Sequence, residues 1–349
     1  MCGLVGVIGG SLASNHFEAF KWMLMFDTTR GEDSTGVAFR KVSHKTKKGE
    51  VTVLKAEGLP SNLYRKFPEV FSSKGVFKNT TITETSVNWL MGHNRAATVG
   101  LVNSLNAHPF HHGGITGCHN GTVRSGLTQL LSGPELKGST DSEKIFYNLS
   151  KGKTLQEIVD VITGGTALTW WDSKKQSFNI YRNKDRPMHI VQDLVNNTIY
   201  YASEAWILKL ALAKINLGHL KDKIEELPED THLEIPLEQG RIVKTVSKVI
   251  KPKVVATVTT SRVITMPSKK NNPPAWLNEK GNSGTSFQPY TGWLSVTNLS
   301  KEAFNYQARF GCSLCQTTLD FSDYLGGDVK WMDKETPFCS QCAKEFSVA

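Results

Sequence analysis

The chain has 349 residues, of which 39% are hydrophobic and 21% are charged, and it carries a formal net charge of +9. That length allows one large domain with a buried core and a smaller second unit. No stretch approaches the roughly 20 consecutive apolar residues that span a bilayer, and the apolar start lacks the basic flank and cleavage site of a secretory signal. The sequence therefore indicates a globular protein without a membrane segment.

Positive charge is concentrated in one part of the chain. Residues 1–244 contain 29 basic and 24 acidic side chains, residues 245–305 contain 8 and 2, and residues 306–349 contain 4 and 6. The middle segment is also rich in Ser, Thr, Asn, Pro and Gly, which is typical of a linker. We therefore divide the chain into a domain over 1–244, a basic linker over 245–305 and a C-terminal unit over 306–349. The linker is a candidate for nucleic-acid contact, although a solvated segment explains the same charges.

Short runs rich in branched and aromatic residues predict strands in the large domain. These runs are 4–8, 35–40, 51–54, 167–171, 178–181 and 198–201. Two Thr-x-x-Glu capping boxes predict helix starts, one at Thr140 with Glu143 and one at Thr154 with Glu157, each followed by apolar residues at helical spacing. Another helix is expected over 204–217. Several strands with a few amphipathic helices predict sheets flanked by helices, in an α+β fold.

The second residue of the chain is a candidate nucleophile. If Met1 is removed, Cys2 carries both a thiol and a free α-amine, and such an amine has an ordinary pKa of about 7.7–8.0. One residue can then supply both nucleophile and base. Gly3 would let a substrate approach the backbone closely. Taken alone, Cys2 is explained equally well as a buried thiol in a first strand.

Five short motifs follow the N-terminal MCG in a fixed order. They are RGEDSTG at 30–36, GHNRAATVG at 92–100, NAHPF at 106–110, HNGTV at 119–123 and STDSE at 139–143. Together they resemble the glutaminase domain of class II, N-terminal nucleophile, glutamine amidotransferases, and are most similar to the glutaminase half of glucosamine-6-phosphate synthase. The resemblance covers roughly residues 1–240. It implies a four-layer αββα sandwich and a reaction of glutamine with water that gives glutamate and ammonia through a thioester on Cys2.

The resemblance implies that Asn120 and Gly121 form an oxyanion hole next to Cys2. An Asn side-chain amide and a backbone N–H are the two types of donor that such a hole uses. The alternative is that Asn-Gly is an ordinary turn dipeptide. Cys118, just before this motif, is interpreted as a core residue.

A second group of residues is predicted to hold the amino-acid head group of glutamine. Arg95 offers a planar fork for the α-carboxylate, and the resemblance implies that Thr98 assists it and that Asp141 accepts the α-ammonium. The alternative for Arg95 is a surface arginine at a strand end. For Asp141 it is an acidic residue favoured by the helix dipole at a helix N-terminus.

Further residues inside the motifs are given supporting roles. Arg30 and Asp33, with Ser34, match an early turn that lies near the nucleophile in the family. His93 and His108 are interpreted as structural or hydrogen-bonding residues, and His108 is also kept as a candidate substrate-binding residue.

Four of the six cysteines form two CxxC pairs near the C-terminus. Cys312 and Cys315 are separated by 23 residues from Cys339 and Cys342. Four thiolates in this pattern predict a structural Zn²⁺ in a small four-cysteine zinc ribbon, with a rubredoxin-like iron site as the alternative. Thiols in such a pattern, and no disulfide framework, favour a reducing, cytoplasmic location.

The sequence shows no partner for the ammonia within the chain. It has no SGGxDS-type nucleotide loop or Walker A loop, and it is too short for a sugar isomerase domain. We therefore expect a separately encoded acceptor enzyme, docked through the linker or the zinc ribbon, and regard a free glutaminase as the alternative. Two other functions remain open, which are hydrolysis of another amide by Cys2 and a non-catalytic module that binds nucleic acid or protein.

Overall fold

The computed structural model describes residues 2–71, 85–97, 100–238, 241–243, 245–252, 319–325, 327–331 and 337–341.

Two antiparallel sheets form the centre of the large domain. The first sheet contains, in spatial order, β11 (Glu225–Glu226), β9 (His189–Asp193), β10 (Thr198–Ala202), β1 (Gly3–Gly9), β4 (Thr85–Arg95), β2 (Ser34–Ser43) and β3 (Gly49–Glu57). The second sheet contains, in the same way, β13 (Arg241–Ile242), β12 (Thr231–Glu238), β8 (Ser177–Arg182), β7 (Thr166–Asp172), β6 (Ile115–Gly121) and β5 (Phe110–His112), with β14 (Val246–Val249) also paired to β12.

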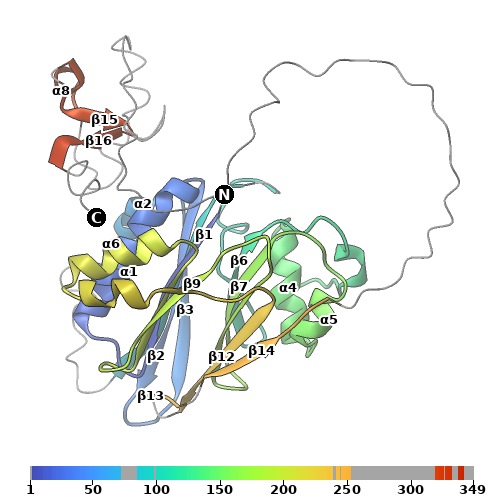
Figure 1. Cartoon of the computed structure of the whole chain (residues 1–349). Helices are drawn as coiled ribbons and strands as arrows, with labels where there is room; N and C mark the ends of the chain where they lie inside the picture. Colours follow the sequence, from blue (N-terminus) through green and yellow to red (C-terminus); the bar gives the residue numbers. More distant parts are fainter. Residues whose placement is uncertain are drawn as a thin grey trace, which may run out of the picture.

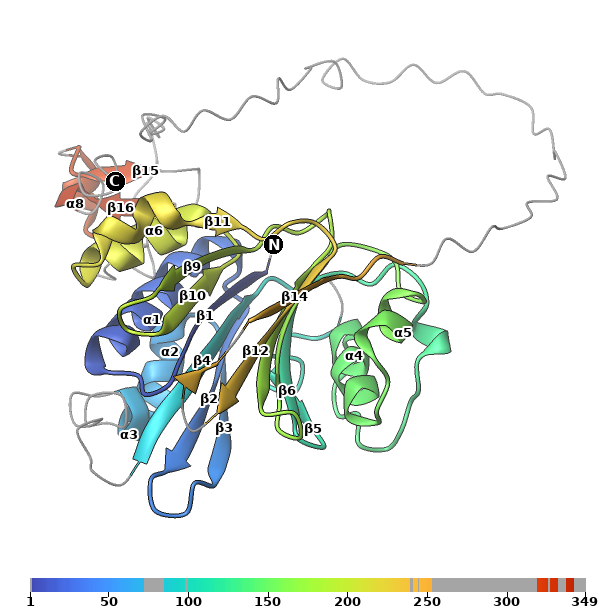
Figure 2. The ribbon, with the colours of Figure 1, turned by 60° about the horizontal axis from the view of Figure 1, so that its bottom comes forward.

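Helices cover the outer face of each sheet, so that the domain has four layers. Figure 1 shows α1 and α6 on one side of the paired sheets and α4 and α5 on the other, and Figure 2 shows the same order after rotation. Over the first sheet lie α1 (Ser14–Phe26), the 3-10 turn η1 (Asp27–Arg30), α2 (Pro60–Lys66), α3 (Pro68–Phe71), α6 (Ala205–Lys214) and the 3-10 turn η3 (Gly218–Lys223). Over the second lie the 3-10 turn η2 (Leu127–Gln129), α4 (Asp141–Ser150) and α5 (Leu155–Val159). The predicted αββα arrangement of two antiparallel sheets is confirmed.

The first strand shows why the chain forms layers. Every residue of β1 is buried, as expected for a strand that is covered on both faces. Because side chains alternate along a strand, Val5 and Val7 pack against the helices of the first layer, whereas Leu4 and Ile8 pack between the sheets. The core between the sheets also holds large aromatic side chains such as Trp89 and Trp171.

The predicted strands are confirmed, and so are the helices expected after Thr154 and Glu204, which are α5 and α6. The Thr154 hydroxyl accepts a hydrogen bond from the Glu157 backbone N–H at 3.2 Å, and the Glu157 carboxylate accepts one from the Thr154 N–H at 2.8 Å. This is the reciprocal capping box that the spacing predicts. No helix among the described residues is long and apolar enough to cross a membrane.

The capping box predicted for Thr140 and Glu143 is wrong, although α4 does begin there. The Thr140 hydroxyl is buried and makes no cap hydrogen bond. The Glu143 carboxylate instead accepts hydrogen bonds from the backbone N–H groups of Lys137 and Gly138, at 3.1 and 2.7 Å. The Glu143 carboxylate therefore accepts its hydrogen bonds from the loop before α4 and not from the backbone at the helix start.

Strand β14 lies within the segment predicted as a linker, so the second sheet continues past residue 244. Further on, the structure describes α8 (Phe321–Leu325), β15 (Val329–Trp331) and β16 (Pro337–Cys339). Leu319 and Val329 are buried in the core beside α1 and α6. Of the predicted zinc ligands, Cys339 is described and partly buried at the end of β16. The other three, Cys312, Cys315 and Cys342, lie outside the described residues.

Candidate active site

Antiparallel pairing brings three sequence motifs to one end of the first sheet. Cys2 immediately precedes β1, whose first residue, Gly3, pairs with Asn94 near the end of β4. The same end of β4 pairs with the start of β2, where Ser34 lies opposite Arg95. The N-terminal residues, the 30–36 motif and the 92–100 motif are therefore neighbours in space, at the end of the domain where the chain starts in Figure 1.

Backbone contacts hold Cys2 in place. Its thiol donates a hydrogen bond to the Ala96 carbonyl oxygen at 3.3 Å, and the Arg30 Nε donates to the Cys2 carbonyl oxygen at 3.1 Å. Burial raises the pKa of the Cys2 thiol, whereas the positive charge of Arg95 lowers it. Because the net pKa shift is upward, the thiol keeps its proton near neutral pH, and a reaction at sulfur needs a base to remove it.

Arg30 is fixed from its far side by an ion pair that the sequence did not indicate. Its guanidinium contacts the carboxylate of Glu204, the residue that precedes α6. Arg30 therefore links the Cys2 backbone to the first helical layer. The supporting role of Arg30 stays a prediction, and the sequence indicates Glu204 only as the start of a helix.

Asp27 is a second carboxyl group that the sequence did not single out. It lies in η1, is fully buried and packs against Gly3, where a Cβ atom would overlap its carboxyl oxygens. The space beside Gly3 is therefore filled by Asp27 and is not open to a substrate. Burial raises the pKa of Asp27 well above its ordinary value, although Arg30 and Asn94 lower it, and neither carboxyl oxygen makes a well-aligned hydrogen bond to the described residues.

Asn120 and Gly121 end a strand and do not form a turn. Both belong to β6 and pair with β7, so the turn-dipeptide alternative is wrong. The Asn120 amide donates to the Ser203 hydroxyl at 3.3 Å, and the same hydroxyl accepts a hydrogen bond from the Leu4 N–H at 2.9 Å. Ser203 thus connects Asn120 to the strand that follows Cys2. A Cβ atom on Gly121 would overlap the Gly165 carbonyl oxygen, so this position requires glycine.

Arg95 is nearly fully buried at the end of β4. Its guanidinium donates to the carbonyl oxygens of Leu101, at 3.1 Å, and Gly100, at 3.5 Å. Burial lowers the pKa of Arg95, whereas the carboxylates of Asp33 and Asp141, and Cys2 in its thiolate form, raise it. These three predicted site residues therefore lie within electrostatic range of one arginine.

Asp33 and Asp141 each bind backbone N–H groups. Asp33 accepts a hydrogen bond from the Ala97 N–H at 2.7 Å, which fixes the start of the loop after β4. Asp141, at the start of α4, accepts one from the Val123 N–H at 2.6 Å and one from the Ser142 N–H at 3.0 Å. Asp141 thus joins the helix start to the segment after Gly121. Thr98 lies outside the described residues, and its predicted role stays a prediction.

Three buried histidines lie beneath this site. The rings of His93 and His108 are 4.1 Å apart, and His93 Nε2 is 3.2 Å from the His119 carbonyl oxygen. Burial lowers the pKa of His93 to about 3 and lowers those of His108 and His119. Neither ring nitrogen of His108 has a hydrogen-bond partner among the described residues. Its packing fits a structural residue, and substrate binding by His108 stays a prediction.

Comparisons with known proteins agree with this architecture. No family model matches the chain. Glutamine--fructose-6-phosphate aminotransferase [isomerizing] of Clostridium acetobutylicum is 29% identical over 299 residues, which cover 76% of this chain and 45% of that protein. The enzyme of the same name from Mesorhizobium japonicum is 34% identical over 128 residues, which cover 36% of this chain and 17% of that protein.

Two solved structures have a similar fold. One is the glutamine phosphoribosylpyrophosphate amidotransferase from B. subtilis in complex with ADP and GMP, with a TM-score of 0.50 and 17% identity. The other is the allosteric regulatory enzyme of purine biosynthesis, with a TM-score of 0.52 and 18% identity. Each match covers 72% of this chain and 49% of the other. This chain thus spans about half the length of the proteins it resembles. The chain shares the fold of these two structures, and its sequence is distantly similar to that of glutamine--fructose-6-phosphate aminotransferases.

Proposed function

We propose that this protein hydrolyses the side-chain amide of glutamine through a thioester on Cys2. The observation that supports the proposal is that strand pairing and the Cys2 thiol bond to Ala96 place Cys2 next to Arg95, while Asp141 binds the segment after Gly121. A nucleophile, a bidentate cation and a carboxylate are the groups that attack an amide while holding an α-carboxylate and an α-ammonium.

In the first step, the α-amine of Cys2, exposed after removal of Met1, accepts the thiol proton. Sulfur attacks the amide carbon, and the Asn120 side chain with the Gly121 N–H stabilises the oxyanion. The C–N bond then breaks, the ammonium returns its proton to the leaving nitrogen, and ammonia departs. Water hydrolyses the thioester, which releases glutamate and restores the thiol. The raised pKa of the Cys2 thiol supports the need for a base in this scheme.

Arg95 would bind the α-carboxylate of glutamine through its guanidinium. In the structure this group donates to the backbone oxygens of Gly100 and Leu101. Because a guanidinium has five donors, an α-carboxylate could share the group with these oxygens. We therefore expect Arg95→Lys to raise KM more than it lowers kcat, because a lysine keeps the charge and loses the fork.

The test combines intact mass with glutamate release from the purified full chain. We expect a mass without Met1 and an activity that Cys2→Ala abolishes. Free glutamine should be a much better substrate than N-acetylglutamine, whose blocked amine cannot pair with Asp141. Retained Met1 together with an inactive wild-type protein would refute the enzymatic proposal. Equal rates with both amides would instead favour an amide hydrolase of different specificity.

The destination of the ammonia is a separate proposal. We infer that an acceptor enzyme on another polypeptide consumes it, and that the linker or the zinc ribbon docks to that enzyme. The charge of the linker supports a docking role, because residues 245–305 carry 8 basic and 2 acidic side chains and suit an acidic surface on a partner. Free ammonia equal in amount to the glutamate released, at a rate that no added synthase changes, would instead favour a free glutaminase.

A further inference from the structure

A cavity lies at the opposite end of the domain from Cys2. It has a volume of about 940 Å³ and is bordered by Gly10 and Ser11, directly after β1. Because β1 has seven residues, which at about 3.3 Å each span roughly 23 Å, this cavity is separate from the candidate active site. Turns of both sheets form its walls, including those that join β2 to β3, β7 to β8 and β9 to β10.

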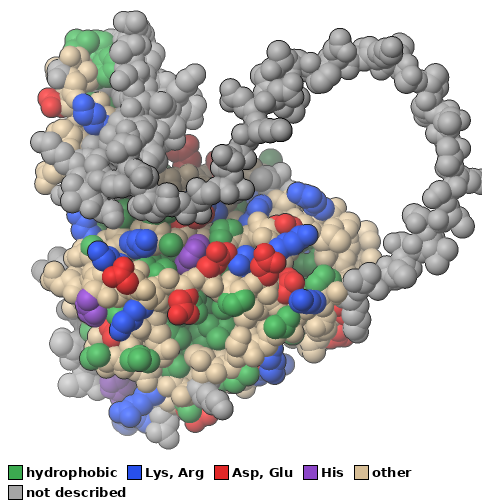
Figure 3. Space-filling view, viewed as in Figure 1, with side chains coloured by type: hydrophobic (Ala, Val, Ile, Leu, Met, Phe, Trp, Pro, Cys, Tyr) green, Lys and Arg blue, Asp and Glu red, His purple; other side chains and the backbone are tan. Residues whose placement is uncertain are grey.

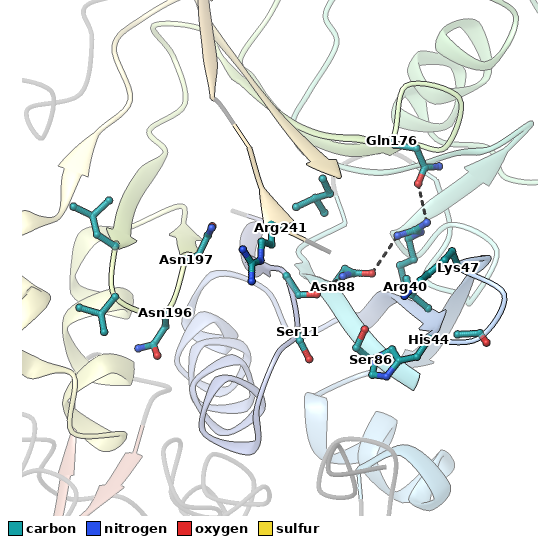
Figure 4. A pocket seen from close by; sticks show the side chains of 16 residues that line it. Ser11, Arg40, His44, Lys47, Ser86, Asn88, Gln176, Asn196, Asn197 and Arg241 are labelled. Atoms are coloured by element: carbon teal, nitrogen blue, oxygen red, sulfur yellow. Dashed lines mark hydrogen bonds between the residues drawn. The ribbon is translucent and has the colours of Figure 1, made fainter. Parts of the chain in front are cut away.

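A buried arginine is the central polar group of this cavity. Arg40, on β2, is only 8% exposed and lies over the Trp171 ring, 5.0 Å from its centroid. Its guanidinium donates to the Asn88 side-chain oxygen at 3.1 Å and to the Gln176 side-chain oxygen at 2.7 Å. Figure 4 shows these two bonds on one side of the cavity and Arg241 with Asn197 facing them.

The partners of Arg40 are themselves held in one orientation. The Asn88 amide nitrogen donates to the Gly10 carbonyl oxygen, and the Gln176 amide nitrogen donates to the Ser173 carbonyl oxygen at 2.6 Å. Both side chains must therefore present oxygen to Arg40. The guanidinium has five donors, and among the described residues these two neutral acceptors are its hydrogen-bond partners.

No carboxylate lines this cavity among the described residues. Its charged lining consists of Arg40, Lys47 and Arg241, with His44 beside them. Burial lowers the pKa of Arg40 without an opposing acidic group, whereas acidic groups raise that of Arg95. The face of the molecule in Figure 3 mixes Lys and Arg with Asp and Glu. A buried cation without a counter-ion is costly unless an anion compensates it.

The other lining groups fit an organic anion better than a bare ion. Ser11, Ser43 and Ser86 add hydroxyl groups, and the apolar side chains of Leu194 and Val195 are 77% and 92% exposed at the rim. A volume of this size accommodates a ligand of several hundred daltons, since ligand pockets typically measure roughly 300–1,000 Å³. Several converging cations are typical of phosphate recognition, because a phosphate offers more charge and more acceptors than a carboxylate.

We propose that this cavity binds a small organic phosphate, with Arg40, Lys47 and Arg241 contacting the phosphate group and Leu194 and Val195 contacting the organic part. The site is independent of Cys2 and of the proposed glutaminase reaction. Arg40 also bridges the two sheets, and a purely structural bridge is the competing explanation. That explanation requires no role for the exposed cations Lys47 and Arg241.

The test measures binding of ribose 5-phosphate to the full chain by isothermal titration calorimetry, with ribose and inorganic phosphate as comparison ligands. We expect saturable binding of ribose 5-phosphate, weaker binding of inorganic phosphate and none of ribose. The double variant Lys47→Gln/Arg241→Gln changes only exposed side chains, so it should fold normally. It should weaken binding by more than about tenfold, since hydrogen bonds to charged groups are worth at least that much.

A matched control is Lys184→Gln/Lys221→Gln, which removes the same charge from exposed positions outside the cavity and should leave binding unchanged. Arg40→Ala, checked for folding by circular dichroism, should abolish binding. Equal binding by wild type and Lys47→Gln/Arg241→Gln, or no binding of ribose 5-phosphate, would overturn the proposal. Equal affinity for inorganic phosphate would overturn the role of the apolar rim. If a DNA oligonucleotide bound more tightly than ribose 5-phosphate, with a steep salt dependence, the proposal would be overturned in favour of a nucleic-acid site.

Discussion

The three buried histidines predict that mild acid destabilises this protein. The rings of His93 and His108 pack against each other at a tilt inside the sandwich, and burial lowers the pKa of both, that of His93 to about 3. In the unfolded chain each imidazole has an ordinary pKa of roughly 6.5. Above that pH neither state binds the proton, so these groups add no pH dependence there. Below it the unfolded chain takes up protons that the folded protein does not, and the free energy of unfolding falls.

The size of this effect follows from the pKa difference. Each histidine lowers the free energy of unfolding by about 1.4 kcal/mol per pH unit between its two pKa values. For His93 alone, a change from pH of about 6.5 to about 4.5 removes roughly 2 kcal/mol, because its folded pKa of about 3 lies below this window. A typical domain has a total stability of about 5–15 kcal/mol. His108 adds a loss of the same sign.

Urea unfolding followed by tryptophan fluorescence, at a series of pH values from neutral to mildly acidic, measures the effect. Carboxylates also make the free energy of unfolding depend on pH. The informative quantity is therefore the slope of that free energy against pH, compared between wild type and variants. His93→Gln should reduce the slope below pH of about 6.5 by up to about 1.4 kcal/mol per unit. His108→Phe, which keeps a ring against His93, gives a second measurement. The exposed His219→Gln should leave the slope unchanged. Slopes for His93→Gln and His108→Phe that equal the wild-type slope would refute the reasoning.

Three further predictions concern two contacts in the large domain and the C-terminal cysteines. Gly3→Ala should destabilise the fold by about 1–3 kcal/mol, because its Cβ overlaps the Asp27 carboxyl. Adding Asp27→Ala should recover much of that loss in a double-mutant cycle, and additive effects would contradict the contact. Thr154→Ala should cost about 1 kcal/mol in thermal or urea unfolding, because it removes the cap bond to Glu157; an unchanged midpoint would exclude a stabilising cap. Zinc should co-purify stoichiometrically with the full chain and be lost from Cys339→Ser in elemental analysis, and equal zinc in both proteins would exclude Cys339 as a ligand.

Local patterns in the sequence were enough to predict much of the framework. Branched and aromatic runs indicated the positions of six strands, because strands that are covered on both faces of a packed sheet select such residues. The Thr154 capping box succeeded because both of its hydrogen bonds form within one turn. The pairing of β4 with β1 and β2 places the 30–36 and 92–100 motifs beside the N-terminus, whereas the roles of their residues stay predictions.

Tertiary structure decided whatever depended on partners distant in sequence. Glu143 has the spacing of a capping residue, but the loop before α4 offers it two backbone N–H groups, and those bonds replace the cap. Asp27 and Glu204 carry no sequence signal that connects them to Cys2. Only the pairing of β1 with β4 and the packing of the helical layer bring them beside it. The burial of Arg40 between two neutral amides likewise requires both sheets, because one amide comes from each. A sequence pattern records local geometry, whereas the electrostatic environment of a side chain is set by whichever groups folding places around it.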